Sequence, residues 1–180
     1  CDEIDCPLDA INLWGSCHDL ASLEVLISFA ENSDFFINDT SMSLNERFEY
    51  VINMGEQTWD AEGQLIQWSY TDYPALKGII PFTIGHLESL EFLDLSDNDL
   101  SGEIPQSIGD LTNLNTLSLF NNNLSGQIPD NIGDLIDLVE LNLGWNDLWG
   151  QIPGNIEDLT SLEALDLRHN DLSGSIPMNI

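Results

Sequence analysis

The strongest constraint in this sequence is a 24-residue period in its second half. Four leucines stand 24 positions apart, at Leu87, Leu111, Leu135 and Leu159, and each opens the same pattern of leucines, one asparagine, one glycine and an Ile-Pro pair. A unit of this length cannot bury its leucines alone, so neighbouring units have to stack and share one core. The period therefore predicts a solenoid of stacked coils.

The repeated pattern resembles the plant-type extracellular leucine-rich repeat family. The consensus LxxLxxLxLxxNxLxGxIPxxIGxL is matched in all four frames, and the third frame departs from it where Glu157 replaces the last glycine. The resemblance implies an α/β solenoid, a right-handed superhelix with a parallel β-sheet on its concave face and a helical, cysteine-containing N-terminal cap. In that family such concave surfaces inhibit secreted enzymes or sense peptides and carbohydrates. The resemblance therefore implies recognition.

A degenerate coil precedes the four repeats. Its closing half keeps the pattern one period before the first full repeat, at Leu76 and Gly78, whereas its strand half places Ser69 where a leucine belongs. We therefore divide the chain into an N-terminal cap, residues 1–62, and a solenoid, residues 63–180, of one degenerate coil plus four 24-residue repeats. The length suits one continuous core.

Two helices are expected in the cap. Asp19 is a candidate N-cap for the first helix. Its apolar face is expected to hold Leu20, Leu23, Leu26 or Ile27, and Ala30. The second helix is expected to start after Ser41 or Ser43. Its buried side is expected to hold Leu44, Phe48, Val51 and Ile52.

All three cysteines lie in the cap. A disulfide between Cys6 and Cys17 would close a small loop and leave Cys1 over, although any of the three pairings is open. Cys1 either pairs within the cap or marks a domain boundary, or it is the acylated first residue of a mature bacterial lipoprotein. Glycosylation sequons begin at Asn38 and Asn123.

The charge is extreme, with 32 acidic residues against Arg47, Lys77 and Arg168, and a formal net charge of −29. Nucleic acid is excluded as a partner because phosphate binding needs clustered Lys and Arg. The sequence contains no apolar run long enough for a transmembrane segment and no signal-peptide pattern, so we expect any secretion signal to have been removed. This composition suits a saline, extracellular setting, with the chain secreted or on a cell surface.

The strand segments predict which residues face a ligand. Leucines alternate with polar and aromatic residues, so the leucines point inward and the intervening residues stand on the concave face. The candidate ligand-binding residues are Tyr70, Tyr73, Phe92, Asp94, Phe120, Asn142, Trp145, Asp166, Arg168 and His169. Two alternatives remain open. Trp68, Tyr70 and Tyr73 could pack under the cap, and the aromatic residues further on could pack on one another.

Other repeated columns are expected to be structural. The asparagine amides should satisfy backbone groups of adjacent coils, and the glycines should mark tight backbone. These columns are Asn98, Asn122, Asn146 and Asn170, and Gly102, Gly126, Gly150 and Gly174. Asp110, Asp134 and Asp158 either cap the turns that follow them or, as weak candidates, bridge calcium. No calcium-loop motif supports the second interpretation.

Catalysis is not expected, because the three histidines are scattered and no catalytic or phosphate-binding motif occurs. No cofactor is expected either. We interpret the chain as an extracellular or cell-surface recognition module that binds a protein, peptide or glycan through its concave face. The alternative is a structural or adhesive surface protein that self-associates through its open solenoid end with the help of calcium.

Overall fold

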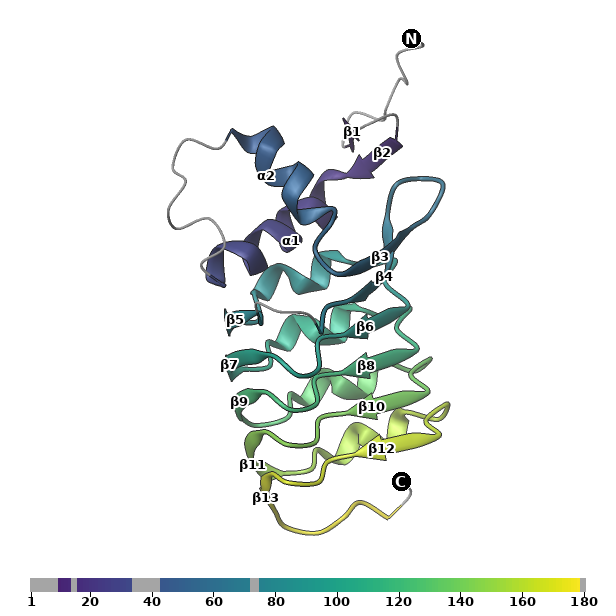
Figure 1. Cartoon of the computed structure of the whole chain (residues 1–180). Helices are drawn as coiled ribbons and strands as arrows, with labels where there is room; N and C mark the ends of the chain where they lie inside the picture. The colour runs from purple at the N-terminus through teal and green to yellow at the C-terminus, as the bar shows by residue number, and fades with distance from the viewer. Residues whose placement is uncertain (1–9, 14–15, 34–42, 72–74, 179–180) are drawn as a thin grey trace.

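The computed structural model of the chain describes residues 10–13, 16–33, 43–71 and 75–178. These residues form a stack of coils, with two helices at the N-terminal end and the last repeat at the opposite end (Figure 1). The degenerate coil and the first three repeats each supply one strand to each of two sheets and one 3-10 helix, and the last repeat supplies two strands. The predicted solenoid is confirmed.

The elements alternate regularly along the chain. An antiparallel hairpin comes first, made of β1 (Ala10–Leu13) and β2 (Ser16–Asp19). The helices are α1 (Leu20–Asn32) and α2 (Leu44–Val51). The six-stranded sheet contains β3 (Glu56–Trp59), β4 (Leu65–Ser69), β6 (Phe92–Asp94), β8 (Thr116–Ser118), β10 (Glu140–Asn142) and β12 (Ala164–Asp166). The five-stranded sheet contains β5 (Lys77–Ile79), β7 (Asp99–Glu103), β9 (Asn123–Gly126), β11 (Asp147–Gln151) and β13 (Asp171–Ser173). The 3-10 helices are η1 (Phe82–His86), η2 (Gln106–Asp110), η3 (Asp130–Asp134) and η4 (Gly154–Asp158).

The six-stranded sheet keeps the sequence period in its register. From β6 to β12 the strands are parallel, and Leu93, Leu117, Leu141 and Leu165 are direct partners. The first three of these leucines are at most 1% exposed. Equivalent residues of successive coils therefore stand in lanes, and the residues between the leucines form the outer face of this sheet, which we call the sheet face.

Glycines occur where the coils approach most closely or turn most sharply. Gly126 has φ +86°, and a Cβ at this position would lie 2.8 Å from Cγ of Glu103 in the preceding coil. Gly109 lacks the unusual φ, but a Cβ there would lie 2.5 Å from the carbonyl oxygen of Asn131. Tight backbone was predicted for the Gly126 column, and the positive φ confirms it.

On the side opposite the sheet face, side chains of the 3-10 helices join each coil to the one before it. Ser107 Oγ donates a hydrogen bond to the carbonyl oxygen of Phe82 at 2.5 Å, and Asn131 Nδ2 donates to that of Gln106. Each 3-10 helix follows a proline, as at Pro105, where φ is −68°. The proline ring fixes φ near this value, so the backbone has the same direction at the start of each 3-10 helix.

Both helices of the cap begin at a residue whose side chain caps the helix. Asp19 caps α1, because its carboxylate accepts a hydrogen bond from the Ser22 amide at 2.7 Å. At α2, Glu46 accepts from the Ser43 amide at 2.7 Å, and Ser43 Oγ accepts from the Glu46 amide at 3.3 Å. This reciprocal pair is a capping box. Of the two expected caps of α2, Ser43 is therefore the one used.

The cap closes the core of the solenoid. Leu23, Leu26 and Phe29 of α1 are fully buried, and the Phe29 ring meets the Trp68 ring of β4 edge-on at a centroid distance of 4.9 Å. The β3–β4 hairpin is antiparallel and extends the six-stranded sheet toward the helices. At the other end of the stack, Leu165 is only partly buried.

Some expectations fall outside what the structure describes. Cys1, Cys6 and the Cys17 side chain lie outside the described residues, as does Asn38. The disulfide and the modification of Cys1 therefore stay predictions. Within the described ranges, no helix combines the length and apolar character that a bilayer span requires.

Candidate ligand-binding face

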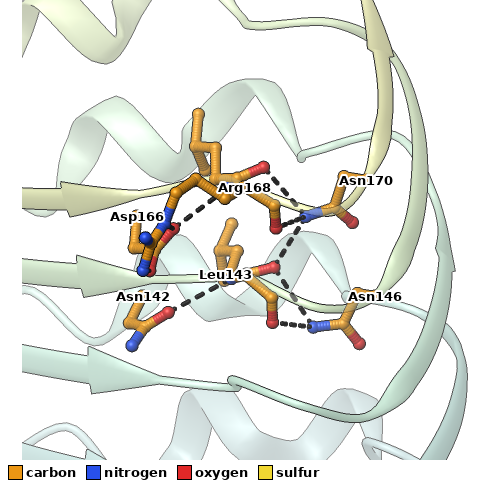
Figure 2. A network of polar contacts seen from close by, with 8 residues as sticks. Asn142, Leu143, Asn146, Asp166, Arg168 and Asn170 are labelled. Atoms are coloured by element: carbon orange, nitrogen blue, oxygen red, sulfur yellow. Dashed lines mark hydrogen bonds and ion pairs between the residues drawn. The ribbon is translucent and has the colours of Figure 1, made fainter.

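The repeated asparagines hold the coils together and are not available to a ligand. Asn122 accepts a hydrogen bond from the Leu100 amide at 3.0 Å, and its Nδ2 donates to the Leu95 carbonyl of the preceding coil at 2.9 Å and to the Leu119 carbonyl of its own coil at 3.2 Å. Asn98, Asn146 and Asn170 make the same set of bonds. The predicted structural role of this column is confirmed, and Figure 2 shows its last two members.

Several predicted ligand-binding residues of the sheet face also have backbone partners. Asp94, Asn142 and Asp166 occupy one lane, and in each the side-chain Oδ1 accepts a hydrogen bond from the amide two residues later, at 3.0 to 3.1 Å. These bonds fix the turn at the end of the strand, as Asx turns do. The Oδ1 atom of each side chain is therefore structural, whereas Oδ2 of Asp94 and Nδ2 of Asn142 take no part in these turn bonds.

Arg168 lies over Asp166 in a forked ion pair (Figure 2). Its Nε meets Oδ1 at 3.0 Å and its Nη2 meets Oδ2 at 2.7 Å, while the arginine side chain is 77% exposed. The hydrogen bonds from the guanidinium lower the pKa of the Asp166 carboxyl. The pair presents a planar, charge-compensated surface at the C-terminal end of an otherwise acidic face.

A lane of left-handed residues borders the sheet face. Among the described non-glycine residues, Asp97, Asn121, Trp145 and His169 have positive φ, between 53° and 56°. Asn and Asp tolerate this conformation because their side chains bond locally, but an indole gains nothing there. A tryptophan held in such a conformation is a strained position of the kind that marks functional sites.

The indole of Trp145 is half exposed and rests on the next coil. Its ring centroid lies 4.0 Å from that of His169, with the ring planes 34° apart. Beside this pair runs a depression of about 300 Å³, which Asn121, Asn123 and Asp147 also line. The structure therefore brings two predicted residues together as one aromatic platform.

Phe92 and Phe120 lie on the sheet face but in different lanes, and each is partly buried. Phe120 is followed in its lane by Gly144, and the two coils are joined by the Asn121 amide bonding to the Gly144 carbonyl at 2.9 Å. A Cβ at Gly144 would lie 3.1 Å from Oδ1 of Asp166 and 3.4 Å from the Arg168 carbonyl oxygen of the following coil, so this lane is closely packed there. Phe120 therefore stands one coil before Trp145, in the lane next to the aromatic platform.

The predicted placement of Tyr70 on this face is wrong, and Trp68 is buried with it. Trp68 pairs with Leu93 in the register of β4 and β6 and is fully buried, and Tyr70 is 6% exposed. The carbonyl of Tyr70 bonds to Asn98 in the way that the Leu95 carbonyl bonds to Asn122. Both residues therefore stand at leucine positions under the cap, which was the open alternative. Tyr73 lies outside the described residues.

The expected role of the aspartate column needs correction. The turns after Asp110, Asp134 and Asp158 are closed by the aspartate backbone carbonyls, which accept from Thr112, Ile136 and Thr160. The carboxylates are exposed and do not cap these turns. Within the described residues, no group of three or more histidine, cysteine, aspartate or glutamate side chains is arranged to hold a metal ion. The calcium interpretation has no ligand set there.

The three histidines lie in different places. His18 is buried in the cap and meets the Trp59 ring edge-on at 4.6 Å, His86 ends η1, and His169 belongs to the platform. Sequence reasoning missed Trp149, which is half exposed on the five-stranded sheet. The signal was present, because the equivalent residues Ser101, Ser125 and Ser173 are all serine.

Comparison with known proteins identifies the repeat. The family described as leucine-rich repeat region matches residues 76–179. No curated protein sequence matches the chain significantly.

Solved structures agree with this assignment. The BIR3–SERK2 complex from Arabidopsis thaliana contains a chain 34% identical to this one, with 87% of this chain and 86% of that chain covered and a TM-score of 0.71. The leucine-rich repeat ectodomain of the receptor kinase GASSHO1/SCHENGEN3 from the same plant, solved with CASPARIAN STRIP INTEGRITY FACTOR 2, is 30% identical over 87% of this chain, at a TM-score of 0.74. This chain spans only 19% of that ectodomain. A plant ice-binding protein is 27% identical, with 86% of this chain and 50% of that one covered and a TM-score of 0.71. The chain belongs to the plant-type leucine-rich repeat family.

Proposed function

We propose that this chain is an extracellular recognition module that binds a protein or peptide through the sheet face. The observation that carries the proposal is the half-exposed indole of Trp145, held in a left-handed conformation and stacked on His169. Large aromatic residues with little rotamer freedom and wide contact area are the usual centres of binding surfaces. Phe120 and Arg168 widen the same surface.

The charge of the face indicates the chemistry of the ligand. Asp94 and Glu140 carry carboxylates on the sheet face, and Arg168 is compensated by Asp166. The net charge of −29 adds a long-range field of the same sign. We therefore expect a ligand with basic residues for the acidic end of the face and aromatic or aliphatic residues for the platform. Association should slow as salt is added.

The relatives support a binding role outside the cell. One related structure is an ectodomain solved with CASPARIAN STRIP INTEGRITY FACTOR 2, and another is the BIR3–SERK2 complex. The likeness to a plant ice-binding protein does not transfer in the same way, because a lane such as Phe92, Thr116, Glu140 and Ala164 is chemically mixed. Self-association through the C-terminal end of the stack stays a prediction.

The proposal can be tested without a known ligand. A phage-displayed peptide library is selected on the wild-type chain, and the enriched peptides are titrated by calorimetry against the variants Trp145→Asn and Phe120→Ala. We expect basic, aromatic peptides whose affinity falls at least about tenfold in either variant, which is about 1.4 kcal/mol. Trp149→Ser, on the other sheet, is the matched control and should bind normally. Enrichment of peptides that bind Trp145→Asn as tightly as wild type, or no enrichment, would refute the face.

A further inference from the structure

A second surface of the molecule carries a residue that departs from the repeat pattern. Between the five-stranded sheet and the 3-10 helices runs a groove of about 370 Å³. Its polar lining comes from Glu103, Gln106, Gln127 and Asp130, its floor from two Ile-Pro pairs, and one end from Trp149. This groove lies on different strands from the sheet face, so it is independent of the proposed function above.

Trp149 breaks a lane whose other members are serines with a fixed role. Ser101, Ser125 and Ser173 each donate a hydrogen bond from Oγ to the glycine carbonyl of the preceding coil, at 3.2 to 3.5 Å. Trp149 lacks the hydroxyl that makes this bond, and 50% of the residue is exposed. The repeat therefore gives up a contact between coils and gains an indole at the surface, beside the groove.

The glycines of one coil make room for polar side chains of the coil before it. The Cγ of Glu103 lies 2.8 Å from the point where a Cβ would stand on Gly126, and Gln127 Nε2 lies 3.1 Å from the corresponding point on Gly150. The glycines thus let these stems lie flat across the next coil. Glu103, Gln127 and Asp130 are exposed, and among the described residues their side-chain oxygen and nitrogen atoms have no hydrogen-bond partner. A ligand would meet donors and acceptors that no other described side chain or backbone group occupies.

We propose that this groove binds a neutral oligosaccharide, with the indole of Trp149 stacked on the C–H face of one sugar ring. The amide of Gln127 and the carboxylates of Glu103 and Asp130 bond to ring hydroxyls. A sugar ring offers an apolar face and a rim of hydroxyls, which is the chemistry that this lining complements. The two carboxylates and the net charge of −29 repel uronic acids and sulfated sugars.

An extended peptide fits this groove less well. Strand addition needs an unpaired strand edge. The strands under the groove, β7, β9 and β11, each have a partner on both sides in the five-stranded sheet. Recognition must therefore come from side chains. Apart from the two Ile-Pro pairs, the groove is lined by Glu103, Gln106, Gln127, Asp130 and Trp149, and none of these residues is cationic.

A second aromatic ring extends the surface toward the N-terminal end. Phe82 of η1 is 76% exposed and begins the lane that continues with Gln106 and Asp130. Three coils separate the level of Phe82 from that of Trp149, or about 14 Å at a strand spacing of about 4.8 Å. A chain of several sugars lying along the stack reaches both rings, whereas a disaccharide reaches one.

The test uses uncharged hexasaccharides of glucose in β-1,4 and β-1,3 linkage, of mannose, of xylose and of N-acetylglucosamine, with hexagalacturonate as the charged comparison. Binding is measured by calorimetry and by tryptophan fluorescence. We expect at least one neutral hexasaccharide to bind, Trp149→Ser to weaken it by at least about tenfold, and hexagalacturonate not to bind. Trp149→Ser restores the repeat residue, so it should fold.

Three further variants test which residues bind the sugar. Trp145→Asn, on the sheet face, should leave sugar binding unchanged. Gln127→Ala should weaken it, and Phe82→Ala should weaken the hexasaccharide but not the matching disaccharide. The proposal is overturned if no neutral hexasaccharide binds wild type, if Trp149→Ser binds as well as wild type, or if hexagalacturonate binds best. Because peptide binding depends on Trp145 and sugar binding on Trp149, either proposal can fail alone.

Discussion

Trp145 stacks on His169 across two neighbouring coils, although both residues hold a left-handed backbone conformation that asparagine and aspartate occupy in the two coils before them. Asn121 and Asp97 use the same positions for a hydrogen bond of 2.7 Å between their side chains. The lane therefore changes from a polar pair to an aromatic pair along the stack. Tryptophan, unlike asparagine and aspartate, makes no local side-chain bond in this conformation, which supports placing the proposed ligand contact at Trp145.

Replacing Trp145 by asparagine should separate binding from stability. Asparagine removes the strain of a left-handed non-glycine residue and loses one ring stack, and both effects are about 1 kcal/mol. We therefore expect the free energy of unfolding to change by less than about 1 kcal/mol. Trp145→Val puts a β-branched residue at the same φ and should destabilise the fold more. Urea denaturation of both variants checks this, and a Trp145→Asn variant less stable than Trp145→Val would contradict it.

Replacing Asn122 by alanine should be strongly destabilising. The change leaves the Leu100 amide and the Leu95 carbonyl without their partner inside the stack. Buried polar groups left unpaired cost about 1–3 kcal/mol each, so we expect a loss of about 2–4 kcal/mol. Asn170→Ala is the matched control in the partly exposed last coil and should cost less, about 1 kcal/mol. Equal losses at the two positions would show that burial does not set the cost.

The Gly126→Ala substitution should be destabilising by about 1–2 kcal/mol, because φ is +86° and the new methyl group would meet Glu103. Gly154→Ala is a suitable comparison, since no atom lies within 4 Å of its Cβ position and its φ is not in the left-handed region. That variant should match wild type or exceed it by up to about 1 kcal/mol through a less flexible unfolded chain. Thermal denaturation of the pair tests the assignment, which a stable Gly126→Ala protein would disprove.

His18 should make the stability of the cap depend on pH. Burial lowers the pKa of its imidazole below 6.5, and its Nδ1 has no hydrogen-bond partner within the described residues. The folded state therefore favours the neutral ring, and between the two pKa values the unfolded chain binds more protons. The free energy of unfolding falls as pH drops from 6.5 through the folded pKa, and this group has no further effect above 6.5.

The variant His18→Phe keeps a ring against Trp59 and removes the titration. Its stability relative to wild type should rise as pH is lowered from about 7.5 to about 5.5, where carboxylates remain mostly ionised. His86→Gln, at an exposed histidine, controls for losing one imidazole. Parallel pH curves for His18→Phe and wild type would count against the buried histidine as the cause.

The sequence predicted the solenoid because a 24-residue period leaves few other ways to bury leucine. The bonding role of Asn98, Asn122, Asn146 and Asn170, which we call the asparagine ladder, was predictable for the same reason, since one amide recurs at the same position of every repeat. The register of the degenerate coil could not be predicted in this way. Tyr70 precedes Leu76 by six positions, whereas Leu95 precedes Leu100 by five. One extra residue turns every side chain of a strand to the other face, so Tyr70 was assigned to the wrong side.

The candidate sites show a similar limit. Trp145 was predicted to be exposed, but nothing in its pattern specified a left-handed φ or a stack on His169. Trp149 was overlooked because the alternating leucines mark only the first strand of each coil, and Trp149 lies on the second. Asp94 and Asn142 were predicted to contact a ligand, and the bonds of their Oδ1 atoms to the turn amides depend on local backbone geometry that composition does not show.

The asparagine ladder has a consequence for how such a protein can vary. Asn98 supplies the bonds that Tyr70 and Leu76 of the preceding coil require, so the degenerate coil keeps its shape although it lacks the repeat pattern in its strand. Each of these coils is thus completed in part by its successor. A coil can therefore lose its consensus residues and acquire new surface chemistry while the asparagine of the next coil keeps its backbone bonded. The coil that can diverge in this way is the one that precedes an intact repeat.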